Sequence, residues 1–299
     1  MSVLAVHPPL HDHAGVRRRG PLGRLADRFG SGVLQVALIL LALFWLIPTL
    51  GLLVVSLRNE QENNSSGWWT FFTKPAEITI KNYGDLLATG FTSSFWNTVW
   101  ITVPATVLVI GIAAMAGYAF AWIEFPGRDG WFLIVVALLV VPIQIALIPI
   151  AKLYGFLGIF GSIPGVVLFH VAFGLPFAIF LLRNFFVGIP KELLEAARMD
   201  GAAEWRIFAT VVFPLAKPAI ASLGIFQFLW VWNDLLVALV FADTRNQPMT
   251  KALQSQMRQF GTNIDILAPG AFLSVIIPLI LFFAFQRYFV QGLLAGSVK

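Results

Sequence analysis

Two groups of residues in this chain could do chemistry. The first is a charged segment, residues 191–218, which reads KELLEAARMDGAAEWRIFATVVFPLAKP. Its acids and bases recur at spacings of three and four residues, which place side chains on one face of a helix and allow ion pairs between them. The second is a set of polar residues inside long apolar stretches: Gln144, His170, Gln227, Asn233 and Asp234. We expect surface binding from the first group and polar contacts inside a helix bundle from the second.

Helix signals divide the charged segment into two short helices. Pro190 suits the first position of a helix, where its missing N–H costs nothing. Glu192 in the first turn and Arg198 in the last turn both favour the helix dipole. Gly201 fits the position just past the helix end, where a positive φ is needed. The first helix, residues 191–200, would be about 15 Å long at 1.5 Å per residue, which is too short to cross a bilayer.

A second helix is expected to begin near Ala202. Its apolar residues recur with helical spacing and predict one apolar stripe of Trp205, Phe208, Ala209 and Val212. Pro214 then marks the return of the chain into the membrane. On physical grounds alone, the two helices are an amphipathic connector at the membrane surface.

The polar residues in the apolar stretches are costly in a membrane. An Asp at the centre of a span costs about 2.5–3.5 kcal/mol on insertion scales, so such groups usually face a bundle interior or a water-filled cavity. Asn233 and Asp234 are adjacent in WVWNDLL, and Gln227 lies two turns earlier. Gln144 lies between two prolines, in a helix expected to be kinked. We expect these four side chains to line a polar pathway through the bundle or to pack between helices, with direct binding of a ligand as the alternative.

The rest of the chain must hold these residues in a membrane. Of its 299 residues, 58% are hydrophobic and 12% are charged, whereas a soluble domain carries about 25% charged residues. About 20 apolar residues cross a bilayer as a helix, and six such helices are predicted, at 33–57, 95–122, 131–151, 163–182, 219–242 and 266–289. The net charge of +5 flanks these apolar blocks, so nucleic acid is not an expected partner. The absence of cysteine excludes disulfides.

Lysine and arginine set the expected orientation. With the N-terminus in the cytoplasm, thirteen of the 20 lysines and arginines fall in cytoplasmic pieces, as the positive-inside tendency requires. Both termini and the charged segment are therefore expected in the cytoplasm. Two external connectors, 58–94 and 243–265, are long, and long loops are often functional. We expect the second connector to contact a partner.

The spacing within the charged segment resembles a known motif. EAARMDG and the later VVFP are similar to the EAA loop of ABC-importer permeases, which reads E-A-A, three residues, G, nine residues, I-x-L-P. The matching residues are Glu195, Ala196, Ala197, Gly201 and Pro214, with Val211 in place of the isoleucine and Phe213 in place of the leucine. The resemblance implies that the first short helix is a coupling helix that docks on a separate ATPase subunit, with Arg198 and Asp200 as part of the same loop.

The resemblance covers residues 83–299. The segment FWNTVWITVPATVLVIGIAAMAGYAFAWIEFPGR is similar to the start of the permease core in carbohydrate importers. Three more segments are similar to the smaller permease subunit of maltose-type systems: GLPFAIFLLRNFFVGIPKELLEAARMDGA, FLWVWNDLLVAL and FQRYFVQGLLAGSVK. It implies an all-α membrane protein with six transmembrane helices and a type I (MetI-like) permease core. We expect a cytoplasmic tail at 1–30, a first helix with an external loop at 31–92, the core at 93–290 and a cytoplasmic tail at 291–299.

The resemblance also implies a transport subunit and not an enzyme. Such a subunit forms a pathway with a second permease subunit in a bacterial or archaeal plasma membrane. Two ATPase subunits hold the ATP and Mg²⁺, so no cofactor is expected in this chain. An extracytoplasmic solute-binding protein would deliver a sugar or oligosaccharide to the external connector at 243–265. The stretch SGWWTFF is similar to α-glucoside-type permeases, which points to an α-glucoside.

Two other classes have less support. An ion-coupled secondary transporter usually buries several ionisable groups and often has internal repeats. Here Asp234 is the one clear intramembrane carboxylate, and no repeat is evident in the sequence. A membrane enzyme would need a catalytic motif, but neither H-E-x-x-H nor G-x-S-x-G is present. The sequence also lacks the phosphate loop G-x-x-x-x-G-K-[ST], so ATP hydrolysis is expected on a partner.

Overall fold

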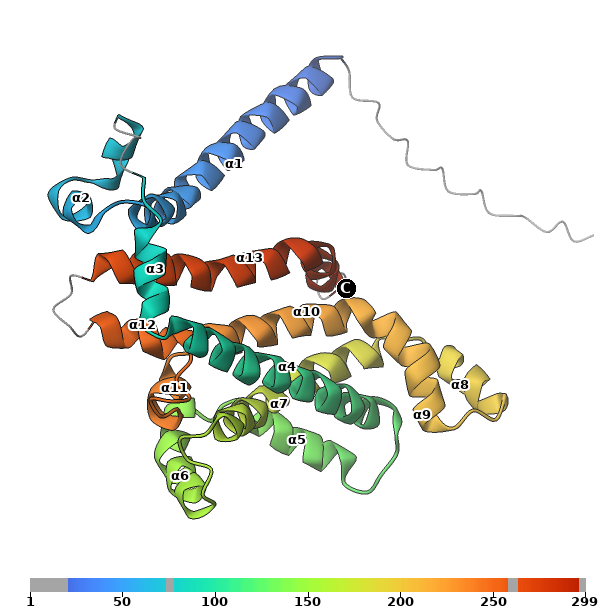
Figure 1. Cartoon of the computed structure of the whole chain (residues 1–299). Coiled ribbons are helices and arrows are strands. Elements are labelled where there is room, and N and C mark those ends of the chain that lie inside the picture. Colours follow the sequence, from blue (N-terminus) through green and yellow to red (C-terminus); the bar gives the residue numbers. More distant parts are fainter. Residues whose placement is uncertain (1–20, 74–77, 258–262, 296–299) are drawn as a thin grey trace, which may run out of the picture. The chain divides into compact units, whose positions relative to one another are not determined.

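The computed structural model describes residues 21–73, 78–257 and 263–295 (Figure 1). The chain divides into two compact units, residues 1–50 and 51–299, and each is described by itself. The described part of the first unit is helical and belongs to α1, Pro21–Ser56, whose last residues lie in the second unit.

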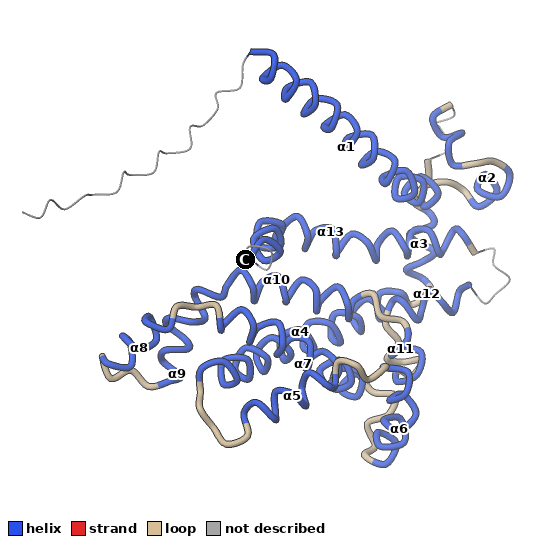
Figure 2. Tube along the Cα trace, turned by 180° about the vertical axis from the view of Figure 1, so that it is seen from behind, coloured by secondary structure: helices blue, strands red, loops and turns tan. Residues whose placement is uncertain are grey.

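The described part of the second unit is built from helices (Figure 2), with isolated bridges between Arg58 and Ile78 and between Gly161 and Ala242. After α1, the elements in chain order are α2 (Glu60–Ser65), η1 (Trp68–Phe72), α3 (Lys81–Ala88), α4 (Phe91–Trp122), α5 (Arg128–Leu138), α6 (Ile143–Phe156), α7 (Ile163–Val187), α8 (Lys191–Met199), α9 (Glu204–Ile207), η3 (Phe208–Val212), α10 (Phe213–Trp232), α11 (Leu236–Phe241), α12 (Met249–Met257) and α13 (Ile264–Ala295).

The core of the second unit lies between α4 and α7, which form the most extensive helix pair among the described residues. Small side chains such as Ala105 and Ala113 on α4 and Ala178 on α7 are fully buried there. Gly117 marks the closest approach, because a methyl group at this position would come within 3.1 Å of the backbone nitrogen of Arg183. Close packing of small residues is the usual way in which transmembrane helices associate.

Length and composition identify five helices among the described residues that could cross a membrane, or six if one bent pair counts as a span. The first, second, fourth and sixth predicted spans correspond to α1, α4, α7 and α13. The third is the bent pair, α5 and α6, whose axes differ by 100°. The sequence predicted a kink here, and the structure shows a complete break between Leu138 and Ile143.

The prediction of one continuous fifth span over 219–242 is wrong at both ends. The helix that includes α10 already begins at Glu204 and ends at Trp232. A new short helix, α11, follows after Asp234. The Asp234 carboxylate accepts hydrogen bonds from the backbone N–H groups of Val237 and Ala238, at 3.3 and 3.1 Å. A carboxylate that binds free N–H groups stabilises the start of a helix, so Asp234 supports a break inside this apolar stretch.

The second helix of the charged segment was also predicted incorrectly as a separate surface helix. It continues from α9 through a π-helical turn, η3, into α10. The N–H of Phe213 bonds to the carbonyl of Phe208, five residues earlier. Pro214 has no N–H and its ring clashes with the preceding turn of an α-helix, and the wider π turn accommodates it without ending the helix. The predicted stripe is wrong in part: Val212 is buried as predicted, but Trp205 is 73% exposed, and Ile207, outside the stripe, is buried.

Candidate functional site: an exposed helical hairpin and a groove between two spans

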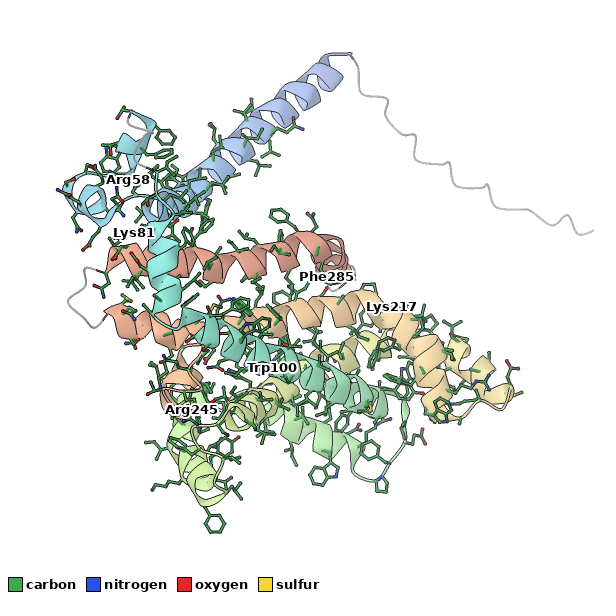
Figure 3. All side chains as sticks on the ribbon, in the orientation of Figure 1. Arg58, Lys81, Trp100, Lys217, Arg245 and Phe285 are labelled. Carbon is green, nitrogen blue, oxygen red and sulfur yellow. The ribbon has the colours of Figure 1, made fainter. Side chains whose placement is uncertain are left out.

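The helix α8 and the turn that follows it project from one end of the second unit, and α6, α11 and α12 lie toward the other (Figures 1 and 2). We call these the α8 end and the α12 end. Figure 3 shows Lys217, on α10 toward the α8 end, and Arg245 beside α11. The predicted coupling residues and the predicted outer connector therefore lie at opposite ends of one helical bundle.

The helix α8 is attached to the bundle by one face. Leu194 is fully buried, and Ala197 and Arg198 are partly buried. Glu195 and Ala196 are exposed on the opposite side, as are Leu193, Met199 and Asp200. The side chain of Met199 is 88% exposed. Small and apolar residues that face outward from a short helix form a surface suited to a protein partner.

The turn after α8 has the glycine conformation that the sequence predicted. Gly201 has a φ of +79°. Its N–H bonds to the carbonyl of Arg198 at 3.0 Å, and the N–H of Ala202 bonds to the carbonyl of Ala197 at 3.1 Å. These two bonds are a Schellman motif, which satisfies the last carbonyls of a helix and needs a left-handed residue, usually glycine. The motif fixes the angle between α8 and α9.

The two short helices α8 and α9 and the turn between them, residues 191–207, form a helical hairpin. A cluster of polar contacts joins its two helices. The guanidinium of Arg198 donates to both carboxylate oxygens of Glu204, from Nε at 2.8 Å and from Nη2 at 3.3 Å. The same Nη2 donates to the carbonyl of Trp122 at the end of α4. The hydroxyl of Tyr118, also on α4, donates to Glu204 Oε2 at 2.5 Å. Charge-assisted contacts of this bidentate kind give geometric specificity.

Glu204 was missed by the sequence reasoning. It lies six residues after Arg198, on the far side of the glycine turn, and this opposite-charge spacing is the one signal that could have indicated it. Tyr118 is 86 residues away in the chain, so no local pattern links it to Glu204. Pro214, in contrast, lies in the first turn of α10 and shapes the helix through η3.

Glu195 has a partner on its own helix. Its Oε1 lies 2.7 Å from the ammonium of Lys191, one helical turn earlier. This hydrogen bond and the charge of Lys191 lower the pKa of the Glu195 carboxyl. Both side chains are more than half exposed, and exposed pairs of this kind contribute little to folding stability. The pair leaves Glu195 ionised and accessible on the surface of α8.

A second candidate site is a groove of about 320 Å³ between α7 and α10. It is lined by Phe173, Gly174, Phe177, Leu223, Phe226, Gln227 and Trp230. The amide of Gln227 is buried against Gly174, where a methyl group would come within 2.8 Å of its Nε2 atom. That Nε2 atom has no hydrogen-bond partner among the described residues. A buried amide in an aromatic groove is suited to binding a polar ligand with apolar faces.

The other predicted pathway residues lie in two places, Asn233 and Asp234 at the end of α10 and Gln144 on α6. Asp234 is 12% exposed, with Oδ2 3.7 Å from Nε2 of His170, and the ring of Trp230 packs edge-on against that histidine. Asn233 is exposed and donates to the carbonyl of Leu229 on its own helix. Gln144 lies elsewhere, in a shallow groove lined by α6 and Val240. The structure thus links Asp234 through His170 to Trp230, which lines the groove of Gln227, and places Gln144 in a different groove.

The connector between α11 and α12 is bound to the bundle by side chains from several segments. Asn97 on α4 donates to the carbonyls of Arg245 and Gln247, at 3.0 and 3.1 Å. Thr98 accepts from the N–H of Met249 at 2.9 Å. The hydroxyl of Thr250, in the first turn of α12, donates to the carbonyl of Asp234 at 2.6 Å, so the start of α12 is bound to the break in the span.

The described residues thus form a bundle of candidate spans with an exposed helical hairpin at one end and a bound connector at the other. The family described as "binding-protein-dependent transport system inner membrane component" matches residues 108–295. The chain belongs to this family, which confirms the resemblance that the sequence indicated.

Two relatives share about half of their aligned residues with this chain. The osmoprotective compounds uptake permease protein GgtD of Synechocystis sp. is 50% identical over 89% of this chain and 91% of the relative. The α-glucoside transport system permease protein AglG of Rhizobium meliloti is 47% identical over 81% of this chain and 66% of the relative. These two are similar in sequence over most of the described structure.

Solved structures share the fold. A chain of a bacterial ABC transporter that imports the acidic polysaccharide alginate superposes with a TM-score of 0.71 and 25% identity, over 88% of this chain and 98% of that one. A chain of the MetNI methionine ABC transporter superposes with a TM-score of 0.53 and 19% identity, over 69% of this chain and 96% of that one. The second match supports the fold alone.

Proposed function

We propose that this chain is a permease subunit of an ATP-driven importer for an α-glucoside, and that α8 couples it to a separate ATPase. The similarity to the α-glucoside permease AglG supports the cargo, and an alginate transporter with the same fold supports carbohydrate import more broadly. The observation that carries the coupling role is the hairpin: α8 exposes Glu195, Ala196 and Met199 while Arg198 and Glu204 fix its angle.

The proposed cycle is alternating access. A solute-binding protein delivers the glycoside at the α12 end, which faces the outside. This chain and a second permease subunit form the pathway between them. Two ATPase subunits, which supply the ATP and Mg²⁺ chemistry, close on the cytoplasmic side and push on α8. Both termini of this chain lie in the cytoplasm, in agreement with the distribution of lysine and arginine.

Cross-linking tests the coupling role. Ala196→Cys places a thiol on the exposed face of α8 in a chain that has no other cysteine. In the assembled transporter, we expect this thiol to cross-link to the ATPase subunit through a short reagent. A cysteine at Ser93, exposed on α4 near the α12 end, is the matched control and should not cross-link. Equal cross-linking of both variants, or of neither, would overturn the assignment of α8.

The groove between α7 and α10 is the proposed contact point for the glycoside. Its aromatic side chains offer stacking surfaces for a sugar ring, and the Gln227 amide offers a donor and an acceptor for hydroxyl groups. Gln227→Leu should raise the KM for uptake about tenfold, because a lost hydrogen bond to a ligand costs about 1.4 kcal/mol. Gln144→Leu, outside this groove, is the control and should leave the KM unchanged.

The cargo is tested with the cognate binding protein and reconstituted transporter. Trehalose, maltose and other α-linked glucosides should stabilise the binding protein against heat and should be taken up when ATP is present. Their β-linked isomers should do neither. Uptake by the reconstituted chain without any ATPase, driven by a proton or sodium gradient, would instead identify an ion-coupled secondary transporter.

A further inference from the structure

The side-chain contacts around Glu204 connect the α8–α9 hairpin to α4, a helix that does not adjoin the hairpin in the sequence. The backbone joins α8 to α7 on one side and to α9 and α10 on the other. α4 is separated from α8 in the sequence by α5, α6 and α7. It nevertheless contacts the hairpin through the Tyr118 hydroxyl and the Trp122 carbonyl, which bind Glu204 and Arg198 respectively. A displacement of α8 can therefore reach α4 through these polar contacts.

α4 is also the helix that runs the length of the bundle between the two functional ends. At the α8 end it carries Tyr118, and near its start it carries Asn97 and Thr98, which hold the connector before α12. Between these points it packs along α7. Packed helices transmit strain because protein interiors have low compressibility. A contact that moves α4 with the hairpin would thus link the ATPase side to the delivery side.

We propose that Glu204 and Tyr118 are positioning residues for ATP-driven transport, which make α4 move together with the coupling helix. The carboxylate of Glu204 joins the two partners, since Oε1 accepts from Arg198 and Oε2 accepts from both Arg198 and Tyr118. The inference rests on the proposed coupling role of α8. It adds that the force reaches α4 by a side-chain contact and not through the backbone alone.

The burial of these groups separates this role from simple support of the fold. The side chains of Arg198 and Glu204 are 34% and 40% exposed, so solvent screens part of the attraction in their bidentate ion pair. The ring of Tyr118 is buried and packs against Phe208 with a centroid distance of 5.3 Å, and Tyr118→Phe would keep that packing. The substitution removes one hydroxyl, and with it the link between Glu204 and the α4 side chain.

The experiment compares variants of the full transporter reconstituted in liposomes with its binding protein. The variants are Tyr118→Phe, Glu204→Ala and Glu204→Gln, each also combined with Ala196→Cys. Three quantities are measured: the rate of ATP hydrolysis, the uptake per ATP hydrolysed, and the cross-linking of position 196 to the ATPase. The matched control is Tyr154→Phe, which alters a buried tyrosine on α6, toward the α12 end.

We expect Tyr118→Phe and Glu204→Ala to lower the uptake per ATP about tenfold, the effect of losing a hydrogen bond to a charged group. ATP hydrolysis and cross-linking should stay within twofold of the parent. Glu204→Gln keeps an oxygen that can accept from Tyr118 and should recover part of the loss, and Tyr154→Phe should behave like the parent.

Two outcomes would overturn the inference while leaving the coupling role of α8 intact. In the first, uptake per ATP is unchanged in Tyr118→Phe and Glu204→Ala although cross-linking persists. In the second, cross-linking and uptake fall together, which would show that the cluster only supports the shape of the hairpin. Absence of cross-linking in the parent Ala196→Cys chain would be a failure of the coupling role itself, and the two failures are thereby distinguished.

Discussion

The two connectors that flank the α9–α10 helix differ in how they relate to the bundle. The connector before α12 is hydrogen-bonded to the bundle through Asn97, and the first residues of α12 are hydrogen-bonded to Thr98 and to the carbonyl of Asp234. The α8 hairpin is attached by the buried side chains of Leu194 and Ile207 and by the Glu204 cluster, while Glu195, Ala196 and Met199 are exposed on it.

This difference shows what each connector can do. A segment that is hydrogen-bonded to two other parts of the chain, α4 and the break at Asp234, changes position only when those parts move, so its position depends on the state of the bundle. A rigid segment that is free on its outer face can be held and displaced by a partner. The fold therefore places a segment that follows the movements of the bundle at the α12 end, and a rigid segment that a partner can displace at the α8 end.

The largest expected effect comes from the turn that sets the angle of the hairpin. Gly201→Val should abolish uptake, because a β-branched residue at a φ of +79° costs about 1–3 kcal/mol and would distort the Schellman turn. A side chain here meets no other atom within 4 Å, so the effect arises from the backbone. Gly201→Asn, which tolerates the left-handed region, should retain most of the uptake. Transport assays in membranes with equal amounts of inserted protein provide the measurement.

The next effect concerns the bound connector. Asn97→Ala removes both hydrogen bonds to the carbonyls of Arg245 and Gln247, a loss of about 1–3 kcal/mol. The connector should then be cleaved faster by protease, and stimulation of ATP hydrolysis by the binding protein should fall several-fold. Ser93→Ala, an exposed change one turn away on α4, is the control. An Asn97→Ala connector as resistant to protease as the parent would show that these bonds do not hold it.

A smaller effect is expected on the exposed face of the hairpin. Trp205→Ala should leave the unfolding free energy within about 0.5 kcal/mol, because the side chain is largely exposed. Affinity for the ATPase subunit should fall by about 1–2 kcal/mol, as is usual for an aromatic residue in an interface. Trp69, 63% exposed in η1, supplies the matched control. Binding of purified ATPase to detergent-solubilised permease distinguishes the two positions.

The smallest effect is expected at the exposed pair on α8. Lys191→Met should not measurably change the thermal unfolding of the chain in detergent. It should let the pKa of Glu195 rise toward its ordinary value, because the lowering is caused by Lys191. A lowered folded pKa contributes stability above the unfolded pKa that is lost as the pH falls through the folded pKa, but an exposed pair contributes little of it. The rise of the Glu195 pKa is checked by an NMR titration of its carboxyl in variant and parent.

Local signals in the sequence predicted α8 and its turn well. Pro190, Gly201 and the charges between them act within a few residues of each other, and the structure confirms the helix and the left-handed glycine. The long apolar runs likewise predicted α4, α7 and α13, since length and hydropathy alone define a span.

Other features depend on contacts that no local pattern contains. Asp234 was expected to be a polar group within a span, but its carboxylate binds the backbone and stabilises a second helix. Pro214 was expected to separate two helices, but a π turn lets the chain continue. The Tyr118–Glu204 contact joins residues from distant parts of the chain. In each case tertiary contacts determine the observed conformation, and the periodicity of the sequence does not reveal such contacts.

The π turn at Phe208–Val212 also sets the direction in which the α8–α9 hairpin points around the axis of α10. A π turn closes its hydrogen bonds over one residue more than an α turn does, and each residue of an α-helix advances the chain by about 100° around its axis. Removing Ala209 would restore an α turn and swing α8 and α9 through about that angle, and it would bring back the steric clash that the π turn relieves at Pro214. The rotational position of the hairpin about the axis of α10 therefore depends on a single residue. It does not depend on which residues the hairpin exposes.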